Sequence, residues 1–353
     1  MRPTVTINLT KIYENAVTVR DTLAKYGVDV TSVTKMHSGN REIVKTLVDA
    51  GIKRFGDSRI ENLMNYQDLP GEKWMIRIPS ISLAEETVKY ADVSLNSEYE
   101  TVKALNEAAK LQNTTHDILV MMDVGDLREG YFERSNALEN AVKMNALSNI
   151  NIRGVAANLT CYGGVLPDEN NLTDLVERKE MIEDAIGKKL EIVSGGNSTS
   201  YTLYREDHPV KGITNIRIGD TIYLGRDDTY RTHIEGMNKD SFTMTAEIIE
   251  LKEKPSVPIG KRGMSALNTR PEFPDHGTRK RAILSVGKQD TDMDMFPFDE
   301  KIHILGGSSD HIIVDITDSD NDYKMGDTIS FYMYYTACLR AFTSKYTVKE
   351  FVR

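Results

Sequence analysis

The feature that most constrains this fold is an alternation of short apolar runs with amphipathic segments between residues 30 and 218. The runs are rich in β-branched residues, as buried strands are, and segments such as 40–51 and 97–110 repeat apolar residues at helical spacing. The expected strands are 30–35, 54–57, 73–77, 93–96, 117–124, 152–158, 191–197 and 214–218. Eight strand–helix repeats predict an α/β fold of the (β/α)8 barrel type, with a doubly wound open sheet as the alternative.

The pattern changes after about residue 240, where β runs follow one another without helical segments between them. These runs are FTMTAEIIELK, KRAILSVG, KIHILGG, HIIVDIT and DTISFYMYY. We therefore expect a barrel over 1–235 and a C-terminal all-β domain over 236–353 that completes the active site. The Pro- and Gly-rich segment 254–280 is expected to be a long loop, and a strand at 4–8 is expected outside the barrel.

Charge and cysteine content narrow the function class. The net charge of −9 argues against a nucleic-acid or anionic-membrane partner, and no apolar run is long enough for a signal peptide or a membrane span. Cys161 and Cys338 are the two cysteines and lie far apart, so we expect no disulfide framework and a reducing cytoplasm. The seven histidines show no metal-ligand spacing, so we expect no metal.

Polar residues at the ends of the expected strands are the candidate site, because barrel enzymes carry function at the carboxyl ends of their strands. Lys35 ends the run VTSVTK and precedes a Gly-Asn turn. A lysine in such a place is usually a solvated surface charge. A partly desolvated lysine, however, is a competent imine-forming amine, and the sequence leaves both interpretations open.

The motif SGGNS at 194–198 follows the seventh strand, where barrels often bind phosphate. The glycines, among them Gly196, let the backbone approach an anion, and Asn197 and Ser198 add polar contacts. A plain glycine-rich turn is the alternative.

Two arginines and an asparagine complete the candidate site. Arg217 lies inside an apolar strand and needs a buried partner, either an ion pair or the ring nitrogen of a cofactor. Arg128 follows the fifth strand and is either a surface residue or a clamp for a carboxylate or phenolate. Asn158 lies at the end of the sixth strand.

Longer motifs resemble the alanine racemase family of pyridoxal-phosphate enzymes, and within it the ornithine racemases. The resemblance extends over essentially the whole chain. It rests on VTK at 33–35, GDSRIEN at 56–62, DVGDLREG at 123–130, NLTCYGG at 158–164, SGGNS at 194–198, RIGDTIYLGR at 217–226, EIIELKEKPSVPIG at 247–260, GKQD at 287–290 and GGSSDH at 306–311.

The resemblance implies pyridoxal 5′-phosphate as cofactor and a role for each matched residue. Lys35 would bind the cofactor through an imine, Asn158 would pack against its ring, and Arg128 would approach its phenolic oxygen or the substrate carboxylate. Arg217 would face the pyridine nitrogen. The residues implied to hold the phosphate are Gly196, Asn197, Ser198 and Tyr335, with Tyr334 as a neighbour that could be confused with Tyr335.

An arginine at the pyridine nitrogen carries a mechanistic expectation. Arginine does not donate its proton at ordinary pH, so the ring nitrogen would stay unprotonated. This suits simple removal and return of an α-proton, whereas a decarboxylase of related fold would be expected to carry an acid at that position. The resemblance therefore implies racemisation.

Racemisation requires two bases, one on each face of the α-carbon. Lys35 would serve one face. Alanine racemases supply the other base as a tyrosine of the partner subunit in a Gly-Tyr-Ala-Asp pattern, and the matching segment here is GKQD, with Lys288 in the tyrosine's place. The second base stays open among Lys288, Asp290, Ser309 and His311, and the shared site implies a homodimer.

The expected substrate is ornithine or a similar basic amino acid. The residues that could bind it are Arg128, Asp290, Ser309 and Asp310, and acidic residues near a distal ammonium could also include Asp292 and Asp294. Acidic loop residues are more often solvated. The alternatives are a racemase of another amino acid such as alanine or lysine, another pyridoxal-phosphate reaction, a non-catalytic regulatory protein that binds the cofactor, and a barrel enzyme that binds a different phosphate.

Overall fold

A computed structural model describes residues 1–264 and 272–353. The chain divides into two compact units, a barrel unit over Ile12–Asn238 and a β unit formed by Met1–Lys11 together with Lys239–Arg353. The sequence predicts that the segment before residue 12 belongs to the barrel, apart from the strand at 4–8. In the structure this segment belongs to the β unit, because its strand pairs there.

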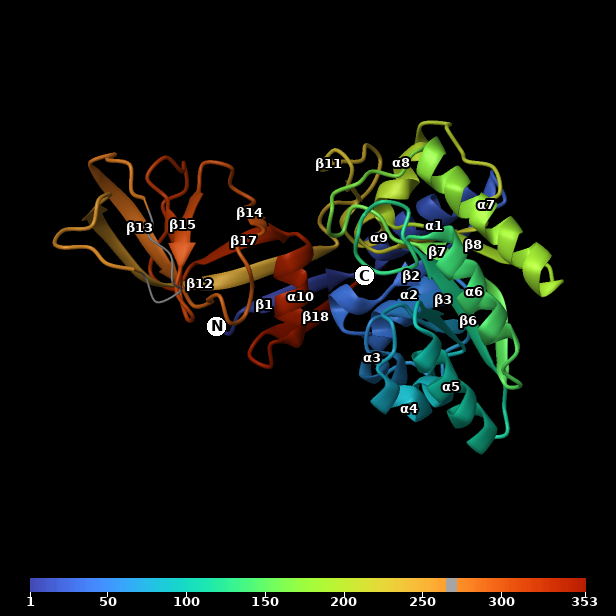
Figure 1. The fold of residues 1–353 in the computed structure, drawn as a ribbon. Coiled ribbons are helices and arrows are strands. Elements are labelled where there is room, and N and C mark those ends of the chain that lie inside the picture. The colour runs from blue at the N-terminus through green and yellow to red at the C-terminus, as the bar shows by residue number, and fades with distance from the viewer. Residues whose placement is uncertain (265–271) are drawn as a thin grey trace. The chain divides into compact units, whose positions relative to one another are not determined.

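Eight parallel strands close into the barrel, and all eight expected strands are present (Figure 1). They are β2 (Asp29–Val33), β3 (Arg54–Asp57), β4 (Glu72–Met75), β5 (Val93–Asn96), β6 (His116–Met122), β7 (Ile150–Ala157), β8 (Ile192–Gly195) and β9 (Asn215–Ile218). Each strand pairs with the next, and β9 pairs back to β2, which excludes an open sheet. The strands are almost continuously buried, as expected for parallel strands covered on both faces.

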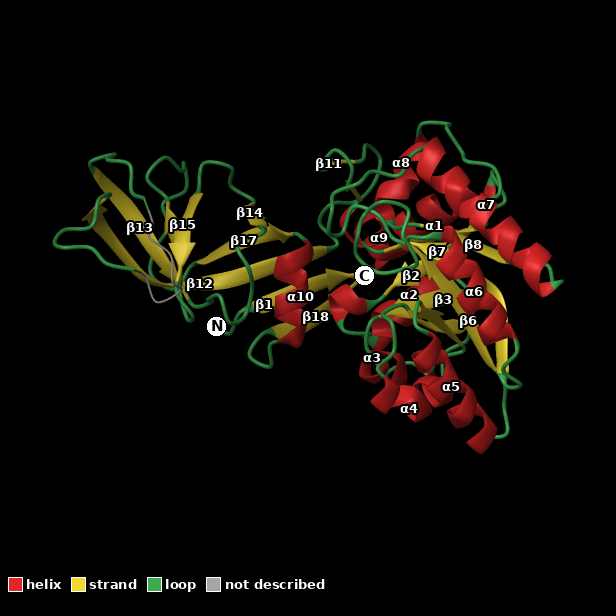
Figure 2. Ribbon diagram, viewed as in Figure 1, coloured by secondary structure: helices red, strands yellow, loops and turns green. Residues whose placement is uncertain are grey.

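Helices surround the strands on the outside of the barrel (Figure 2). They are α1 (Leu9–Ala24), α2 (Arg41–Asp49), α3 (Ile60–Met64), α4 (Ala84–Tyr90), α5 (Tyr99–Leu111), α6 (Arg134–Asn145), α7 (Glu169–Ile186), α8 (Tyr201–Arg205) and α9 (Asp220–Leu224). Short 3-10 turns occur at η1 (Lys35–His37), η2 (Ile81–Leu83) and η3 (Ser198–Ser200). Side-chain caps mark where two of these helices begin. The Asn40 side chain accepts hydrogen bonds from the first backbone N–H groups of α2, and α7 begins with an Asp168–Asn171 capping box.

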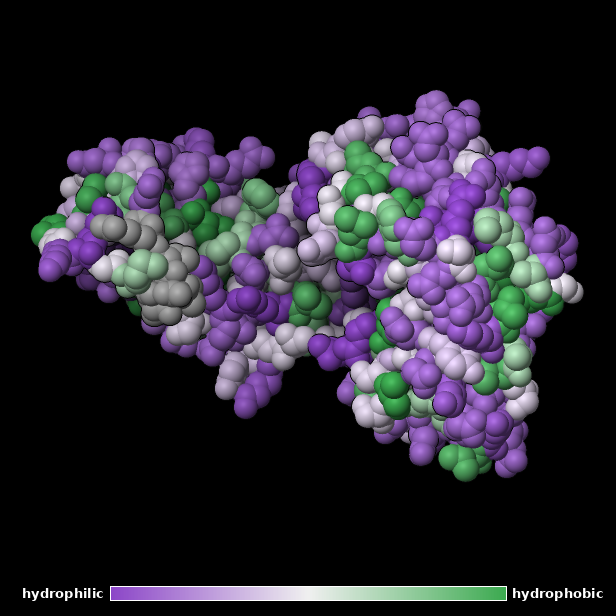
Figure 3. All heavy atoms as spheres, in the orientation of Figure 1, coloured by the Kyte–Doolittle hydropathy of each residue, from purple (hydrophilic) through white to green (hydrophobic). Residues whose placement is uncertain are grey.

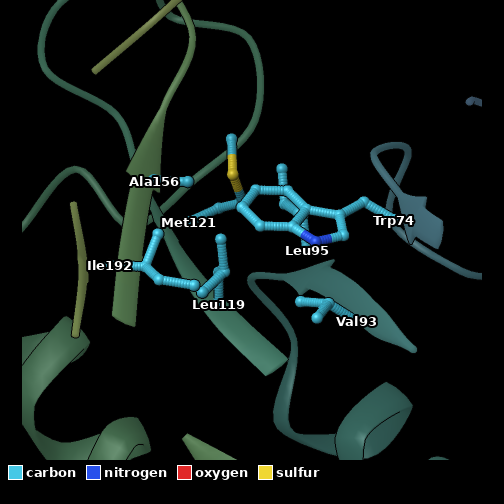
Figure 4. Packing of buried hydrophobic residues seen from close by; sticks show 7 residues of the cluster. All are labelled: Trp74, Val93, Leu95, Leu119, Met121, Ala156 and Ile192. Atoms are coloured by element: carbon cyan, nitrogen blue, oxygen red, sulfur yellow. The ribbon is translucent and has the colours of Figure 1, made fainter. Parts of the chain in front are cut away.

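A buried cluster joins neighbouring strands of the barrel (Figure 4). Its members come from β4 to β8 and are Trp74, Val93, Leu95, Leu119, Met121, Ala156 and Ile192. Trp74 is completely buried in this cluster. Truncation of such a residue to alanine typically costs about 3–5 kcal/mol, so this cluster contributes substantially to the rigidity of the barrel.

The β unit contains a largely antiparallel sheet in the order β14-β17-β12-β13-β16-β15. Its strands are β12 (Phe242–Pro255), β13 (Thr278–Leu284), β14 (Met295–Pro297), β15 (His303–Gly307), β16 (Ile312–Asp315) and β17 (Thr328–Met333). The strand β1 (Thr4–Asn8) pairs antiparallel with β12 and parallel with β18 (Val348–Val352). The long β12 therefore pairs with β1 and β17 in its first half and with β13 in its second half.

The second domain is built on the antiparallel β sheet that the sequence predicts, and it also carries one helix that was not predicted. The helix α10 (Tyr335–Thr343) follows β17 and buries Ala337, Cys338 and Ala341 at helical spacing. The barrel unit also has a short hairpin, β10 (Arg226–Asp227) with β11 (Thr232–His233), that was not predicted. Most of the expected loop at 254–280 connects β12 to β13, and its residues 265–271 lie outside the described part of the chain.

Hydrophilic residues dominate the face of each unit that is visible in Figure 3, with smaller apolar patches between them. Over the described residues, none of the helices combines the length and apolar character that crossing a bilayer requires.

Candidate active site

Lys35 lies on a tightly held turn just beyond the carboxyl end of β2. The strand ends at Val33, so Lys35 is the first residue of η1 and not the last residue of the strand as predicted. It is half-buried. The preceding hydroxyl, Thr34 Oγ1, donates to Asp57 Oδ2 at 2.6 Å, and the following turn reverses through a left-handed Ser38 (φ 52°). The lysine thus occupies the edge of the barrel where function is expected.

The predicted phosphate motif folds into a cradle after β8. Gly196 adopts φ 93°, a conformation that side chains disfavour, and a Cβ there would overlap the Ser200 hydroxyl. The Asn197 carboxamide oxygen accepts from the Thr199 amide at 3.0 Å and caps η3. The Ser198 hydroxyl is buried and accepts the backbone N–H of Gly219 at 3.2 Å.

Gly219 is a component of this cradle that the sequence analysis missed. It follows β9 directly and precedes α9. The available signal was the Gly in RIGD, placed between a strand and an apolar run, but a glycine at a strand end has many structural roles. Its contact with Ser198 joins the carboxyl ends of β8 and β9.

Arg217 is buried inside the barrel with neutral partners. It is 4% exposed, and its guanidinium donates to the Ala157 carbonyl at 2.7 Å and to the Ser194 hydroxyl at 2.7 Å. It forms no ion pair with any described residue, which removes one of the two expected interpretations. Burial lowers its pKa to about 10, so the group stays cationic at neutral pH.

Arg128 and Asn158 come together at the ends of β6 and β7. Arg128 is exposed and forms an ion pair with Glu129. Asn158 is buried beside Arg128, and its hydrogen-bond surroundings are satisfied when the carboxamide is oriented so that its oxygen accepts from the Arg128 guanidinium at 3.1 Å. The Asn197 side-chain amide donates a hydrogen bond to the carbonyl oxygen of the next residue, Leu159, at 2.6 Å. This loop therefore also contacts the cradle.

A pair of half-buried carboxyl groups, those of Asp220 and Asp228, lies near Lys35 and was not predicted. Burial raises the pKa of Asp220, and the charge of Asp228 raises it further, while the cation of Lys35 opposes the shift. Burial also raises the pKa of Asp228, with Arg226 opposing. The two groups therefore tend to hold a proton between them, which limits negative charge beside the cradle.

In the β unit, the two predicted loops GKQD and GGSSDH lie against each other. The Lys288 amide donates to the Ser308 carbonyl at 2.9 Å, and the Gln289 side chain donates to Asp310 at 2.9 Å. Gly287 permits this contact, because a Cβ there would overlap the Ser309 carbonyl oxygen. Lys288 is half-buried, whereas Ser309, Asp310 and His311 are exposed.

The acidic residues proposed for a distal ammonium differ in their surroundings. Asp290 is buried and accepts the Ser344 hydroxyl at 2.8 Å, so its carboxylate faces the interior of its own unit. Asp292 pairs with Arg340 at 3.6 Å. Asp294 accepts the Thr336 hydroxyl at 3.2 Å beside the start of α10. Of the four acids, Asp310 is the exposed one.

Tyr335 is the first residue of α10 and is partly exposed. Its neighbour Tyr334 precedes the helix, donates its backbone N–H to the Asp294 carbonyl at 2.9 Å and packs its ring 5.0 Å from that of Phe296. The predicted site residues therefore form two sets. Lys35, Arg128, Asn158, Gly196–Ser198 and Arg217 belong to the barrel unit, and Lys288, Asp290, Ser309–His311 and Tyr335 belong to the β unit.

Characterised proteins resemble this chain over most or all of its length. The sequence profile described as "Alanine racemase, N-terminal domain" matches residues 7–227. The chain belongs to the alanine racemase family. Its relatives include an ornithine racemase of Acetoanaerobium sticklandii, 46% identical over 99% of both chains. A lysine racemase of Thermotoga maritima is 38% identical over 99% of this chain and 98% of that protein.

Solved structures of alanine racemases share the fold of this family member at low sequence identity. The enzyme from Streptomyces lavendulae superposes with a TM-score of 0.75 at 14% identity, covering all of this chain and 97% of that one. The enzyme from Bartonella henselae, which carries covalently bound pyridoxal phosphate, superposes with a TM-score of 0.72 at 17% identity over the full length of both chains.

The barrel residues fit the cofactor on which the alanine racemase family depends. A half-buried amine, a cradle with a hydroxyl and backbone N–H groups, and a buried cation match an aldehyde, a phosphate and a pyridine ring respectively. Over the described residues, there is no group of three or more His, Cys, Asp or Glu that could hold a metal ion.

Proposed function

We propose that this protein is a pyridoxal-phosphate-dependent racemase that interconverts L- and D-ornithine. One geometric observation carries the proposal. The strands β8, β9 and β2 are consecutive in the closed barrel. Ser198, Arg217 and Lys35, which belong to the ends of these three strands, therefore lie along one arc of the barrel rim, where one cofactor could contact all three.

The chain's own residues define how the cofactor would be held. The Ser198 hydroxyl and the turn at Gly196–Asn197 would hold its phosphate, with Tyr335 as a further candidate from the β unit. Arg217 would face the ring nitrogen and Asn158 the ring. When bound, pyridoxal phosphate supplies an electron-withdrawing ring that stabilises negative charge at the substrate α-carbon.

Arg217 would offer a fixed positive charge and not a mobile proton. Its pKa of about 10 keeps it protonated at neutral pH, and its guanidinium is fixed by Ala157 and Ser194. A group that keeps its proton favours return of the α-proton over reactions that need a fully protonated ring.

Proton transfer needs a base on each face of the α-carbon. The Lys35 amine would remove or return the proton on one face. Lys288 and His311 are the candidates for the opposite face, and Lys288 is favoured because its backbone is fixed through Ser308 and Arg340 and the residue is half-buried. Arg128 follows β6 in the loop after Met122, and it would bind the substrate carboxylate.

Substrate, assembly and location belong to the same proposal. The similarity to an ornithine racemase and a lysine racemase over nearly the whole chain supports a basic substrate. Asp310, which is exposed, and Ser309, which donates to it at 2.7 Å, are the candidates for its distal ammonium. We propose a homodimer with shared active sites, in the cytoplasm.

The test is exchange of the α-proton for deuterium, followed by NMR in D2O with cofactor-loaded protein and L-ornithine, L-lysine or L-alanine. Chiral analysis of the products accompanies it, and a Lys35→Ala variant serves as the inactive control. We expect loss of the α-proton signal of L-ornithine together with appearance of D-ornithine. If amino acids change the absorption spectrum of the bound cofactor but no α-proton exchanges, the protein is a cofactor-binding regulator instead.

A further inference from the structure

A buried tyrosine contacts both sides of the Lys35 turn. The hydroxyl of Tyr223, on α9, is hydrogen bonded to Ser32 Oγ at 2.9 Å and to His37 Nε2 at 3.0 Å. Ser32 lies in β2 before Lys35, and His37 ends the 3-10 turn after it. All three side chains are completely buried, and the Tyr223 and His37 rings pack edge to face with centroids 4.9 Å apart.

The protonation of this contact follows from its geometry. The backbone N–H of Asn40 donates to His37 Nδ1 at 3.1 Å, so a neutral His37 carries its proton on Nε2 and donates to the Tyr223 hydroxyl. Burial lowers the pKa of His37 to about 3, which keeps the ring neutral across the working range of pH. The contact is therefore an uncharged, directional hydrogen bond.

The same helix is connected to the phosphate cradle. The backbone N–H of Tyr223 donates to the Gly219 carbonyl at 3.2 Å, and the Gly219 N–H donates to Ser198 Oγ at 3.2 Å. One short, buried segment, 219–223, therefore contacts the cradle at one end and the lysine turn at the other. Its length and the hydrogen bonds at its two ends set the separation between the two.

We propose that Tyr223 is a positioning residue that holds the Lys35 amine at the correct distance from the Ser198 cradle. This inference rests on the proposed function, because it concerns the reaction of the Lys35 amine with the aldehyde of a cofactor whose phosphate lies in that cradle. In this reaction a C=N bond forms and one water leaves. A misplacement of about 1 Å can slow such a step about 100-fold, so the anchor on the turn matters for the rate.

The other side of the turn has its own anchor, so loss of the Tyr223 contact need not unfold it. Thr34 Oγ1 donates to the buried carboxylate of Asp57 and lies 3.1 Å from the Tyr66 hydroxyl. Asp57 also accepts the Asn62 side-chain amide at 2.9 Å. Removal of the Tyr223 hydroxyl should therefore loosen η1 on one side only.

The experiment compares Tyr223→Phe with a matched control, Tyr204→Phe. Tyr204 is also buried, at 1% exposure, but its hydroxyl has no hydrogen-bond partner among the described residues. Two quantities are measured on cofactor-free protein without amino acid. One is the rate at which pyridoxal phosphate becomes attached to Lys35, trapped with borohydride and located by peptide mass. The other is the affinity for pyridoxine 5′-phosphate, which has the phosphate but no aldehyde.

We expect Tyr223→Phe to attach the cofactor about tenfold more slowly, because the hydroxyl's buried hydrogen bonds to Ser32 and His37 are lost, with affinity for pyridoxine 5′-phosphate within about twofold of wild type. Tyr204→Phe should match wild type in both. An unchanged attachment rate in Tyr223→Phe overturns the proposal. A loss of both quantities also overturns it, since the tyrosine then supports the cradle itself.

The outcome for wild type separates this inference from the proposed function. If wild-type protein does not attach pyridoxal phosphate at Lys35, the cofactor assignment fails, and with it the basis for the inference. If wild type attaches the cofactor at Lys35 and Tyr223→Phe does so equally fast, the positioning role fails and the cofactor assignment stands.

Discussion

At the scale of the residue, the candidate site combines groups proposed to hold the cofactor with groups that alter their surroundings. The half-buried carboxyl pair of Asp220 and Asp228 belongs to the second kind. Burial raises both pKa values above the ordinary 3.8, so folding favours the protonated acids. The stability from this effect is fully present below pH 3.8 and is lost as the pH rises through the raised values.

Asp228→Asn should therefore stabilise the protein at pH 8 while leaving it nearly unchanged at pH 4, because an amide has no proton to lose. A gain of about 1 kcal/mol corresponds to an increase of roughly 2–4 °C in the Tm of a domain this large. Thermal melts at the two pH values measure the effect. Asp184→Asn, an exposed position with the same change in net charge, should show no such dependence on pH; an equal response in both variants would assign the effect to net charge.

Sequence reasoning predicted the residues that project from strand ends and missed those that reach the site through tertiary contacts. Lys35, Ser198 and Arg217 could be found because a barrel presents the carboxyl ends of its strands on one rim. Tyr223 could not, since its partner Ser32 is 191 positions away and nothing local marks a tyrosine in an apolar run as polar in function. The carboxyl pair was missed for the same reason.

At the scale of the element, the contact between the GKQD and GGSSDH loops depends on one glycine. Gly287→Ala would place a Cβ against the Ser309 carbonyl, so the loops must separate. We expect a loss of about 1–3 kcal/mol in stability and a marked fall in racemisation, because Lys288 moves with its loop. Calorimetry and polarimetry measure these two effects.

Gly263→Ala is the matched control in the same unit, because a Cβ at Gly263 would meet no atom of the described residues within 4 Å. It should leave both stability and racemisation unchanged. If Gly287→Ala melts at a lower temperature but racemises at the wild-type rate, the GKQD loop takes no part in catalysis.

A helix or strand could be predicted from the sequence where its apolar pattern differs clearly from the pattern of the adjoining segments. The barrel strands are short apolar runs bounded by helical segments, and all eight were found. The helix α10 was not predicted, because its sequence follows directly on the apolar run of β17 and shares its composition. Its helical period becomes clear only once Ala337, Cys338 and Ala341 are known to share the buried face.

At the scale of the whole molecule, the proposed homodimer with shared sites makes a quantitative prediction. A Lys35→Ala variant and a Lys288→Ala variant should each be inactive alone. When the two are mixed under conditions that exchange subunits, about a quarter of wild-type activity should return, since half of the dimers are hybrids and half of their sites carry neither substitution. Chiral chromatography of the ornithine product follows the recovery.

A mixture that stays inactive, while native mass spectrometry shows that hybrid dimers have formed, would mean that each site is built from one chain. Full activity of Lys288→Ala alone would instead move the second base to another residue, with His311 the remaining candidate. The two results therefore test the assembly and the assignment of the base separately.

The pairing of β1 with β12 and β18 has a consequence for biosynthesis. Residues 4–8 leave the ribosome before the barrel, but their partner Val348 follows 340 positions after Asn8. At a synthesis rate of about 5–20 residues per second, this strand waits roughly 20–70 s for its last neighbour. The barrel strands end at residue 218, so the barrel can close before β12 emerges and offers β1 its first partner. The arrival of β18 then completes the pairing of β1, which makes completion of the β unit the last step in the folding of this chain.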